Sequence, residues 1–256
     1  MEISDIEGQA GAFNGFASVR VSGFDDIGQL VDAVREARTA VPESRVLITL
    51  DDIDQAAYTS MHAWEADDLE VPDDEWGAPS DGEQWDEAAD ERHELAQASR
   101  LARLLAERRG TVPLEGLAER LMTSERDVAA LVKVNAEPNL LLDRVSHLLT
   151  VPVDADDLVL AGAPNGYFSG DLDVFANHAL AWHLQQRHGY RLFGEGASWL
   201  GFERDHPLGQ EEAAAVVADL ISAYGAPDAP GWAELAQVIR GKDLLLLGYT
   251  ENYVDL

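Results

Sequence analysis

The feature that most constrains this chain is an acidic run between Asp51 and Glu91. The run contains sixteen Asp or Glu residues and no Lys or Arg, and it supplies more than half of the formal net charge of −30. An ionised carboxylate that leaves water without a partner costs several kcal/mol. We therefore expect the run to be either a solvated, mobile insert or a surface shaped for a cationic partner.

Composition places the chain as a whole among globular proteins. Its 256 residues are 46% hydrophobic, which is too apolar for a wholly disordered chain. The absence of cysteine excludes disulfides, thiolate metal sites and cysteine nucleophiles. The first ten residues lack the basic and apolar segments of a signal peptide, and no apolar window is long enough to span a bilayer. The sequence thus predicts a cytoplasmic protein without a membrane segment.

General acidity does not explain the run. The other 215 residues carry 32 acidic and 18 basic side chains, so they are acidic as well. A salt-adapted surface would spread its carboxylates evenly, whereas here their density peaks in one segment. The peak therefore needs an explanation of its own.

Patterning divides the chain into four regions. Residues 1–64 read as β-α-β, with strands expected at 16–21 and 46–50 and a helix beginning near Asp25. Residues 65–91 are the acidic flexible insert, where prolines and glycines argue against continuous helix or strand. Residues 92–150 are expected to be helical. The helices predicted there cover 94–109, 114–121, a segment that begins at Ser124, and 139–149.

Residues 151–256 read as a C-terminal α/β domain. Strands are expected at 157–161, 190–193, 199–202 and 244–247, and helices at 173–188, 210–224 and 232–240. The predicted fold class is α/β (α+β), with an antiparallel or mixed sheet, helices packed on one face and a ferredoxin-like split β-α-β in this half. The N-terminal β-α-β would either extend the same sheet or form its own layer.

Residues 94–134 resemble trihelical, helix-turn-helix DNA-binding modules, although they match no single family. The segment from Ser124 would be the recognition helix, and its exposed charges nearly cancel. Because phosphate contacts supply most nonspecific DNA affinity, a molecule this acidic would repel a duplex. We favour a small helical bundle packed by its leucines and expect no direct nucleic-acid binding.

The acidic run also contains large apolar side chains. Carboxylates that alternate with tryptophans are typical of segments that fold onto a partner, with the charges steering a basic surface and the indoles filling pockets. The candidate partner-binding residues are Trp64, Asp73, Asp74, Glu75, Trp76, Glu83, Trp85, Asp86 and Glu87. Strict imitation of DNA phosphates is less favoured, because glycines and prolines make the segment a poor stiff rod. Alternatively, the run folds back on the arginine-bearing helix that follows it and serves only as a tethered loop.

A glycine-rich loop at 165–170 precedes the helix expected at 173–188. Asp171, Asp173 and His178 could ligate a metal, but either aspartate is more simply an N-cap. That helix also carries His183 and His188. Histidines five residues apart lie about 140° apart around a helix, so we expect no convergence of the three on one ion.

These patterns favour a non-enzymatic acidic protein that binds a basic protein surface through its insert. An inhibitor, an immunity-type protein or an accessory subunit would fit. No catalytic residue, metal site or cofactor is assigned. The alternatives are a helix-turn-helix regulator that uses residues 94–134 and a metal-dependent enzyme with a site near Asp171 and His178.

Overall fold

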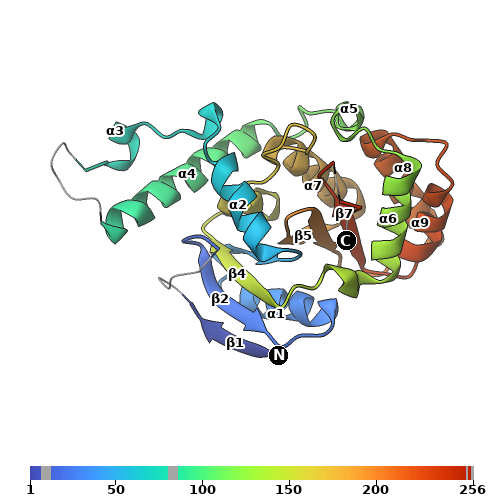
Figure 1. The fold of residues 1–256 in the computed structure, drawn as a ribbon, viewed down its shortest axis with the longest axis horizontal. Coiled ribbons are helices and arrows are strands. Elements are labelled where there is room, and N and C mark those ends of the chain that lie inside the picture. Colours follow the sequence, from blue (N-terminus) through green and yellow to red (C-terminus); the bar gives the residue numbers. More distant parts are fainter. Residues whose placement is uncertain (7–12, 80–85, 252, 255–256) are drawn as a thin grey trace.

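The computed structural model describes residues 1–6, 13–79, 86–251 and 253–254, and its secondary structure is mixed α and β (Figure 1). The strands are β1 Glu2–Asp5, β2 Ala17–Ser22, β3 Arg45–Thr49, β4 Val145–Val151, β5 Arg191–Glu195, β6 Trp199–Glu203 and β7 Leu244–Gly248. The helices are α1 Ile27–Ala40, α2 Ile53–Ala63, α3 Asp73–Trp76, α4 Glu87–Glu107, α5 Ala118–Leu121, α6 Glu125–Ala136, α7 Val174–His188, α8 Gln210–Tyr224 and α9 Gly231–Ile239. Short 3-10 turns are η1 Asp67–Leu69, η2 Leu114–Gly116, η3 Pro138–Leu141 and η4 Asp156–Gly162.

The strands form one mixed sheet in the order β1-β2-β4-β3-β5-β6-β7. Neighbours pair antiparallel except β3 and β5, which are parallel. The N-terminal strands therefore extend the same sheet as the C-terminal strands. The predicted α/β class with a mixed sheet is confirmed.

Residues typical of helix ends correctly predicted the bounds of helices in the C-terminal half. Helix α7 begins after Asp173, whose Oδ1 accepts a hydrogen bond from Ala176 N at 2.9 Å, and it ends at Gly189 with a φ of 71°. A left-handed φ of this kind is the usual glycine role at a helix end. Helix α8 has the predicted bounds, and β5 and β6 form the predicted hairpin.

Two predicted elements are wrong. The helix expected at 139–149 is instead η3 followed by β4, which lies between β2 and β3 and is hydrogen-bonded on both edges. Its leucines resemble a helical stripe, but pairing on both sides overrides that preference. The strand expected at 157–161 is the 3-10 segment η4, which packs against α4 and α7 rather than joining the sheet.

Other elements are shorter than predicted or were not predicted. The helix expected at 114–121 is only η2 and the single turn α5, which ends where Met122 adopts a φ of 47°. Strand β1 was not predicted because all of its residues are exposed and carry no alternating apolar pattern. Helix α2 was not predicted either. It lies within the acidic run, where closely spaced carboxylates interrupt the apolar pattern of a helix.

A buried ion pair joins α1 to the far part of the sheet. The Glu203 side chain in β6 is fully buried, and Arg35 Nε donates a hydrogen bond to its Oε2 at 2.7 Å. Arg38 also donates to this carboxylate and, through Nη2, to Leu192 O at 2.8 Å. A buried carboxylate with two such partners satisfies the requirement that buried charges be paired.

Helix α4 extends beyond the sheet, with α3 beside its outer end (Figure 1). Helix α2 lies near the inner part of α4, so the acidic run covers one end of the molecule. In the described part of the chain, no helix is long and apolar enough to cross a membrane.

Candidate functional site

The acidic run is largely ordered into short elements. It contains α2, η1, α3 and the first turn of α4, and between 65 and 86 these elements are short, as prolines and glycines there argued against a continuous helix or strand. Most of its carboxylates are on the surface. Among the residues whose exposure the structure describes, the exposed acidic residues of the run are Asp52, Asp54, Glu65, Asp68, Glu70, Asp73, Asp74, Glu75, Asp86, Glu87, Asp90 and Glu91.

The two described tryptophans of the run do not form a joint binding patch. Trp76 is only 7% exposed and packs with Val71 and Ala89 in a small apolar cluster, with its ring 4.8 Å from that of His93. Trp76 is therefore not exposed as a free indole, because it packs α3 against α4. Trp64 is half-buried against the main core. Trp85, also predicted to bind a partner, lies outside the described residues, as does Glu83.

The predicted carboxylates have different surroundings. Asp73, Asp74 and Glu75 lie exposed on α3, and Glu87 is exposed in the first turn of α4. Asp86 is the N-cap of α4, and its Oδ1 accepts a hydrogen bond from Ala89 N at 2.9 Å. Carboxylates at these positions favourably meet the positive ends of the helix dipoles.

The run is also tethered to the helix that follows it, as one of the sequence readings proposed. Arg108 lies 3.2 Å from the Asp68 carboxylate, and Arg100 Nε donates to Asp68 O at 3.1 Å. Both arginines belong to α4 or its C-cap. An exposed ion pair of this kind contributes only about 0–1 kcal/mol, so it anchors η1 without neutralising the surface.

A groove of about 360 Å³ runs between α2 and α4. Tyr58, Met61 and Trp64 line it from α2 and its C-cap, and Glu94 and Gln97 line it from α4. Tyr58 is 49% exposed and Met61 is 55% exposed, values that are high for large apolar side chains. The groove therefore presents an apolar floor inside an acidic surface. Sequence reasoning identified Trp64 here but not Tyr58 or Met61.

The segment that resembled a helix-turn-helix uses its last helix for internal packing. Helix α6 packs against α9 and β7, with Val128, Leu131 and Val134 fully buried. Its N-terminus has the predicted Ser124 capping box, completed by Asp127. The exposed positions of α6 include Arg126 and Lys133, which carry charges of the sign that phosphates attract.

Asp171, Asp173 and His178 do not come together. Asp171 is buried and its Oδ1 accepts from Glu251 N at 3.2 Å, whereas Asp173 caps α7 and pairs with Arg120. His178 is buried with its Nε2 3.0 Å from Asp157 Oδ2. Each side chain is thus satisfied by its own partner, and these residues form no joint metal site.

A group of buried and half-buried acids lies where the parallel strands β3 and β5 end. Asp51 follows β3, and Glu195 is the last residue of β5. Burial raises the pKa of Asp51 to about 7 and raises the pKa of Glu195 well above its usual value, with the Asp51 charge adding to the effect on Glu195. Burial also raises the pKa of Asp171 to about 6. None of these three acids lines the α2–α4 groove.

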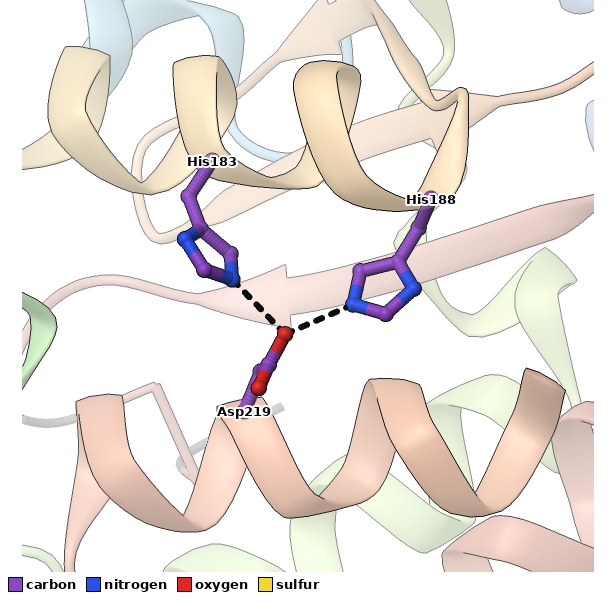
Figure 2. A group of neighbouring side chains, drawn as sticks. All are labelled: His183, His188 and Asp219. Atoms are coloured by element: carbon purple, nitrogen blue, oxygen red, sulfur yellow. Dashed lines mark hydrogen bonds and ion pairs between the residues drawn. The ribbon is translucent and has the colours of Figure 1, made fainter. Parts of the chain in front are cut away.

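The three α7 histidines do not meet at one point, but two of them converge on a carboxylate of the next long helix. His183 and His188 point from α7 toward Asp219 on α8, and their Nε2 atoms lie 2.7 and 2.8 Å from its Oδ2 (Figure 2). The two imidazoles leave α7 on either side of the face that packs against α8. The Asp219 carboxylate on α8 lies between them and contacts both. Burial opposes ionisation of Asp219, but hydrogen bonds from both histidines outweigh it and hold the pKa of this carboxyl below its usual value. The signal that was missed is Asp219 itself, on the next long helix.

Comparison with known proteins adds no functional assignment. No protein-family model, curated protein or solved structure matches this chain significantly.

Proposed function

We propose that this protein binds a basic, amphipathic segment of another protein at the surface formed by α2, α3 and α4. The observation that carries the proposal is the apolar groove between α2 and α4, set inside a surface on which the described part of the run has twelve exposed carboxylates. An inhibitor, an immunity-type protein or an accessory subunit would use such a surface.

The apolar part of the surface would supply affinity. Tyr58 and Met61 are about half exposed, and Trp64 lies beside them with its indole partly accessible. Burying a large apolar side chain is worth about 1.5–3 kcal/mol, and aromatic side chains are the commonest anchors at interfaces. A partner helix with an apolar stripe would cover these three residues.

The carboxylates would supply steering and selectivity. Asp54 lies one helical turn before Tyr58, and Glu91 lies one turn before the groove residue Glu94. A field of one sign raises the association rate with an oppositely charged partner and disfavours acidic ones. The same field opposes nucleic acid, which makes the helix-turn-helix alternative less favourable.

The proposal differs from the sequence hypothesis in where the anchors lie. Trp76 stabilises the packing of α3 on α4, so the carboxylates of α3 are held in place rather than free to fold onto a partner. The surface would thus bind with little ordering cost. The anchors are Tyr58, Met61 and Trp64.

The test uses synthetic peptides of defined chemistry. A Lys/Leu peptide with helical periodicity is titrated by calorimetry, beside a scrambled peptide of the same composition and a Glu/Leu peptide with the same periodicity. We expect the periodic Lys/Leu peptide to bind most tightly, with affinity that falls severalfold between 50 and 300 mM salt because exposed charges are screened. The Glu/Leu peptide should not bind.

Matched variants locate the binding. Met61→Ser should weaken binding by about tenfold, since central truncations cost more than about 1 kcal/mol. The triple variant Asp54→Asn, Glu87→Gln, Glu91→Gln should weaken it more than a control that removes three charges elsewhere, Glu36→Gln, Glu43→Gln, Glu234→Gln. Equal binding of the scrambled and periodic peptides, or equal effects of the two triple variants, would show only nonspecific polyanion behaviour and would refute the proposal.

A further inference from the structure

The side chains that converge between α7 and α8 form a second constellation, remote from the acidic surface. We refer to His183, His188 and Asp219 as the His–Asp cluster. His188 is the last residue of α7 and is 5% exposed in its side chain, whereas His183 and Asp219 are 29% and 17% exposed. The cluster is thus anchored on one side and open on the other.

The three ligand atoms have the spacing that a small metal ion needs. Each residue offers one atom, and these atoms all lie within 4.8 Å of one another. Ligands bonded to a tetrahedral Zn²⁺ at about 2.0–2.2 Å are separated by about 3.3–3.5 Å. The observed 2.7 and 2.8 Å between nitrogen and oxygen would therefore widen by about 0.5–0.8 Å on binding. Among the described residues, no other set of three His or acidic side chains has this arrangement.

The hydrogen bonds of the cluster are crowded onto one atom. Besides the two imidazoles, Arg187 Nε lies 3.0 Å from the same Asp219 Oδ2. A carboxylate oxygen has two lone pairs, so the two imidazoles and the Arg187 ion pair compete for it. A cation placed between the imidazoles and the carboxylate would relieve this competition by using the nitrogen lone pairs as ligands.

The His–Asp cluster borders a pocket, so a metal ion bound there would have an open coordination position. A cavity of about 630 Å³ lies beside the cluster and is lined by His183, Asp219, Trp182, Gln186 and Arg187, together with the segment around Val112. Structural zinc sites have four protein ligands, whereas sites with three keep a position for water or another exchangeable ligand. Arg187 lines the same pocket, so its positive charge would favour an anionic ligand there.

We propose that the His–Asp cluster binds one divalent first-row transition metal ion, with Zn²⁺ as the best match, and leaves a fourth position open to the pocket. Two imidazoles and one carboxylate suit Zn²⁺ or its neighbours, whereas Mg²⁺ and Ca²⁺ prefer ligand sets made of oxygen alone. The exchangeable ligand would be water or a small anion held near Arg187. This site is independent of the α2–α4 groove.

The experiment measures metal binding directly. Tag-free, chelator-treated protein is titrated with Zn²⁺ by calorimetry in 150 mM salt and 5 mM Mg²⁺. The competing cations then occupy weak, nonspecific sites on the surface carboxylates. We expect one equivalent to bind with a micromolar or lower dissociation constant. Co²⁺ should give visible absorption bands of the intensity typical of four- or five-coordinate sites.

Variants assign the binding to the cluster. His183→Ala and Asp219→Asn should each weaken Zn²⁺ binding by a hundredfold or more and abolish the Co²⁺ bands. The matched controls His206→Ala and Asp228→Asn change exposed residues and should leave both unchanged. Circular dichroism in chelator establishes that each variant is folded, and Zn²⁺ should raise the melting temperature of the wild-type protein and the controls only.

Two outcomes would overturn the proposal. If Zn²⁺ binds no more tightly to the wild-type protein than to folded His183→Ala, the cluster is only a hydrogen-bonded contact between α7 and α8. If the His206→Ala control loses as much affinity as His183→Ala, the binding is adventitious. Neither result bears on the peptide-binding proposal, because its variants and probes concern different residues.

Discussion

The carboxylate of Asp51 accepts a hydrogen bond from the backbone N–H of Ser198, with Oδ2 3.0 Å from the nitrogen. This contact joins the end of β3 to the turn of the β5–β6 hairpin, and the backbone N–H of Ala197 in that turn also donates to Asp51 O at 3.0 Å. Space there is limited, since a Cβ on Gly196 would lie 1.9 Å from Asp51 Oδ1. That oxygen is buried and has no hydrogen-bond partner among the described residues. The environment therefore favours the neutral carboxyl group.

We predict that Asp51 makes the protein less stable as the pH rises from about 4 to 7. Burial raises the pKa of Asp51 to about 7 in the folded protein, whereas an unfolded aspartate has a value of about 3.9. Between these values the folded protein holds a proton that the unfolded chain has released, so raising the pH favours unfolding. The slope for one group is at most about 1.4 kcal/mol per pH unit.

The measurement compares urea unfolding of wild-type protein and Asp51→Asn from pH 4.5 to 8. The amide is neutral throughout, so the variant should gain stability relative to the wild-type protein as the pH rises. Exposed Asp54→Asn is the control, and its difference from the wild-type protein should stay within about 0.5 kcal/mol. A difference for Asp51→Asn that is flat with pH would show that Asp51 is ionised in the folded state.

Trp76 should hold α3 on α4 without supporting the main core. Its cluster with Val71 and Ala89 is separate from the large cluster that contains the sheet residues. Trp76→Ala should therefore increase hydrogen exchange in residues 71–78 and 86–93 while lowering the global free energy of unfolding by less than about 1 kcal/mol.

Trp232→Ala provides the contrast for Trp76→Ala. Trp232 is 3% exposed in the main core, and its Nε1 donates to Ala226 O at 2.9 Å. Removing it should lower the global stability by about 3–5 kcal/mol. If Trp76→Ala proves equally costly, α3 and the main core unfold as one unit.

The sequence was most informative where one residue determines a local conformation. Asp173 and Gly189 are the caps at the two ends of α7, and Ser124 is the N-cap of α6. These helix ends could be predicted because capping depends on neighbours along the chain. The sequence was least informative where contacts with residues distant in the chain determine the secondary structure. The leucines of β4 resemble a helix until β2 and β3 are placed on either side, and η4 resembles a strand until α4 and α7 cover it.

The candidate sites follow the same division. The density of carboxylates in the acidic run is visible in the sequence, but the burial of Trp76 depends on a contact between α3 and α4. The His–Asp cluster needs Asp219 on a helix that begins more than twenty residues after His188, and no spacing rule within α7 includes it. Residue types thus indicated the chemistry, and tertiary packing decided which residues meet.

Asn135 should be among the most costly polar residues to replace, because it completes the outer edge of the sheet. Strand β7 is the last strand in the sheet order, so one edge of its backbone lacks a neighbouring strand. The Asn135 side chain on α6 makes hydrogen bonds to both the backbone N–H and the backbone C=O of Leu246 on this edge. Its Nδ2 donates to Leu246 O at 2.7 Å, and its Oδ1 accepts from Leu246 N at 2.9 Å. A single amide thus satisfies a buried N–H and a buried C=O.

Asn135→Leu would leave both backbone groups of Leu246 unpaired away from water. Each unsatisfied group costs about 1–3 kcal/mol, so the variant should lose roughly 2–5 kcal/mol of unfolding free energy in urea, and the Leu246 amide should lose hydrogen-exchange protection. Lys133→Leu, at an exposed position of the same helix, should change stability by less than about 0.5 kcal/mol. Equal stability of the two variants would mean that water or a shift of α6 replaces the amide, and β7 would then be a less firmly held edge than its contacts indicate.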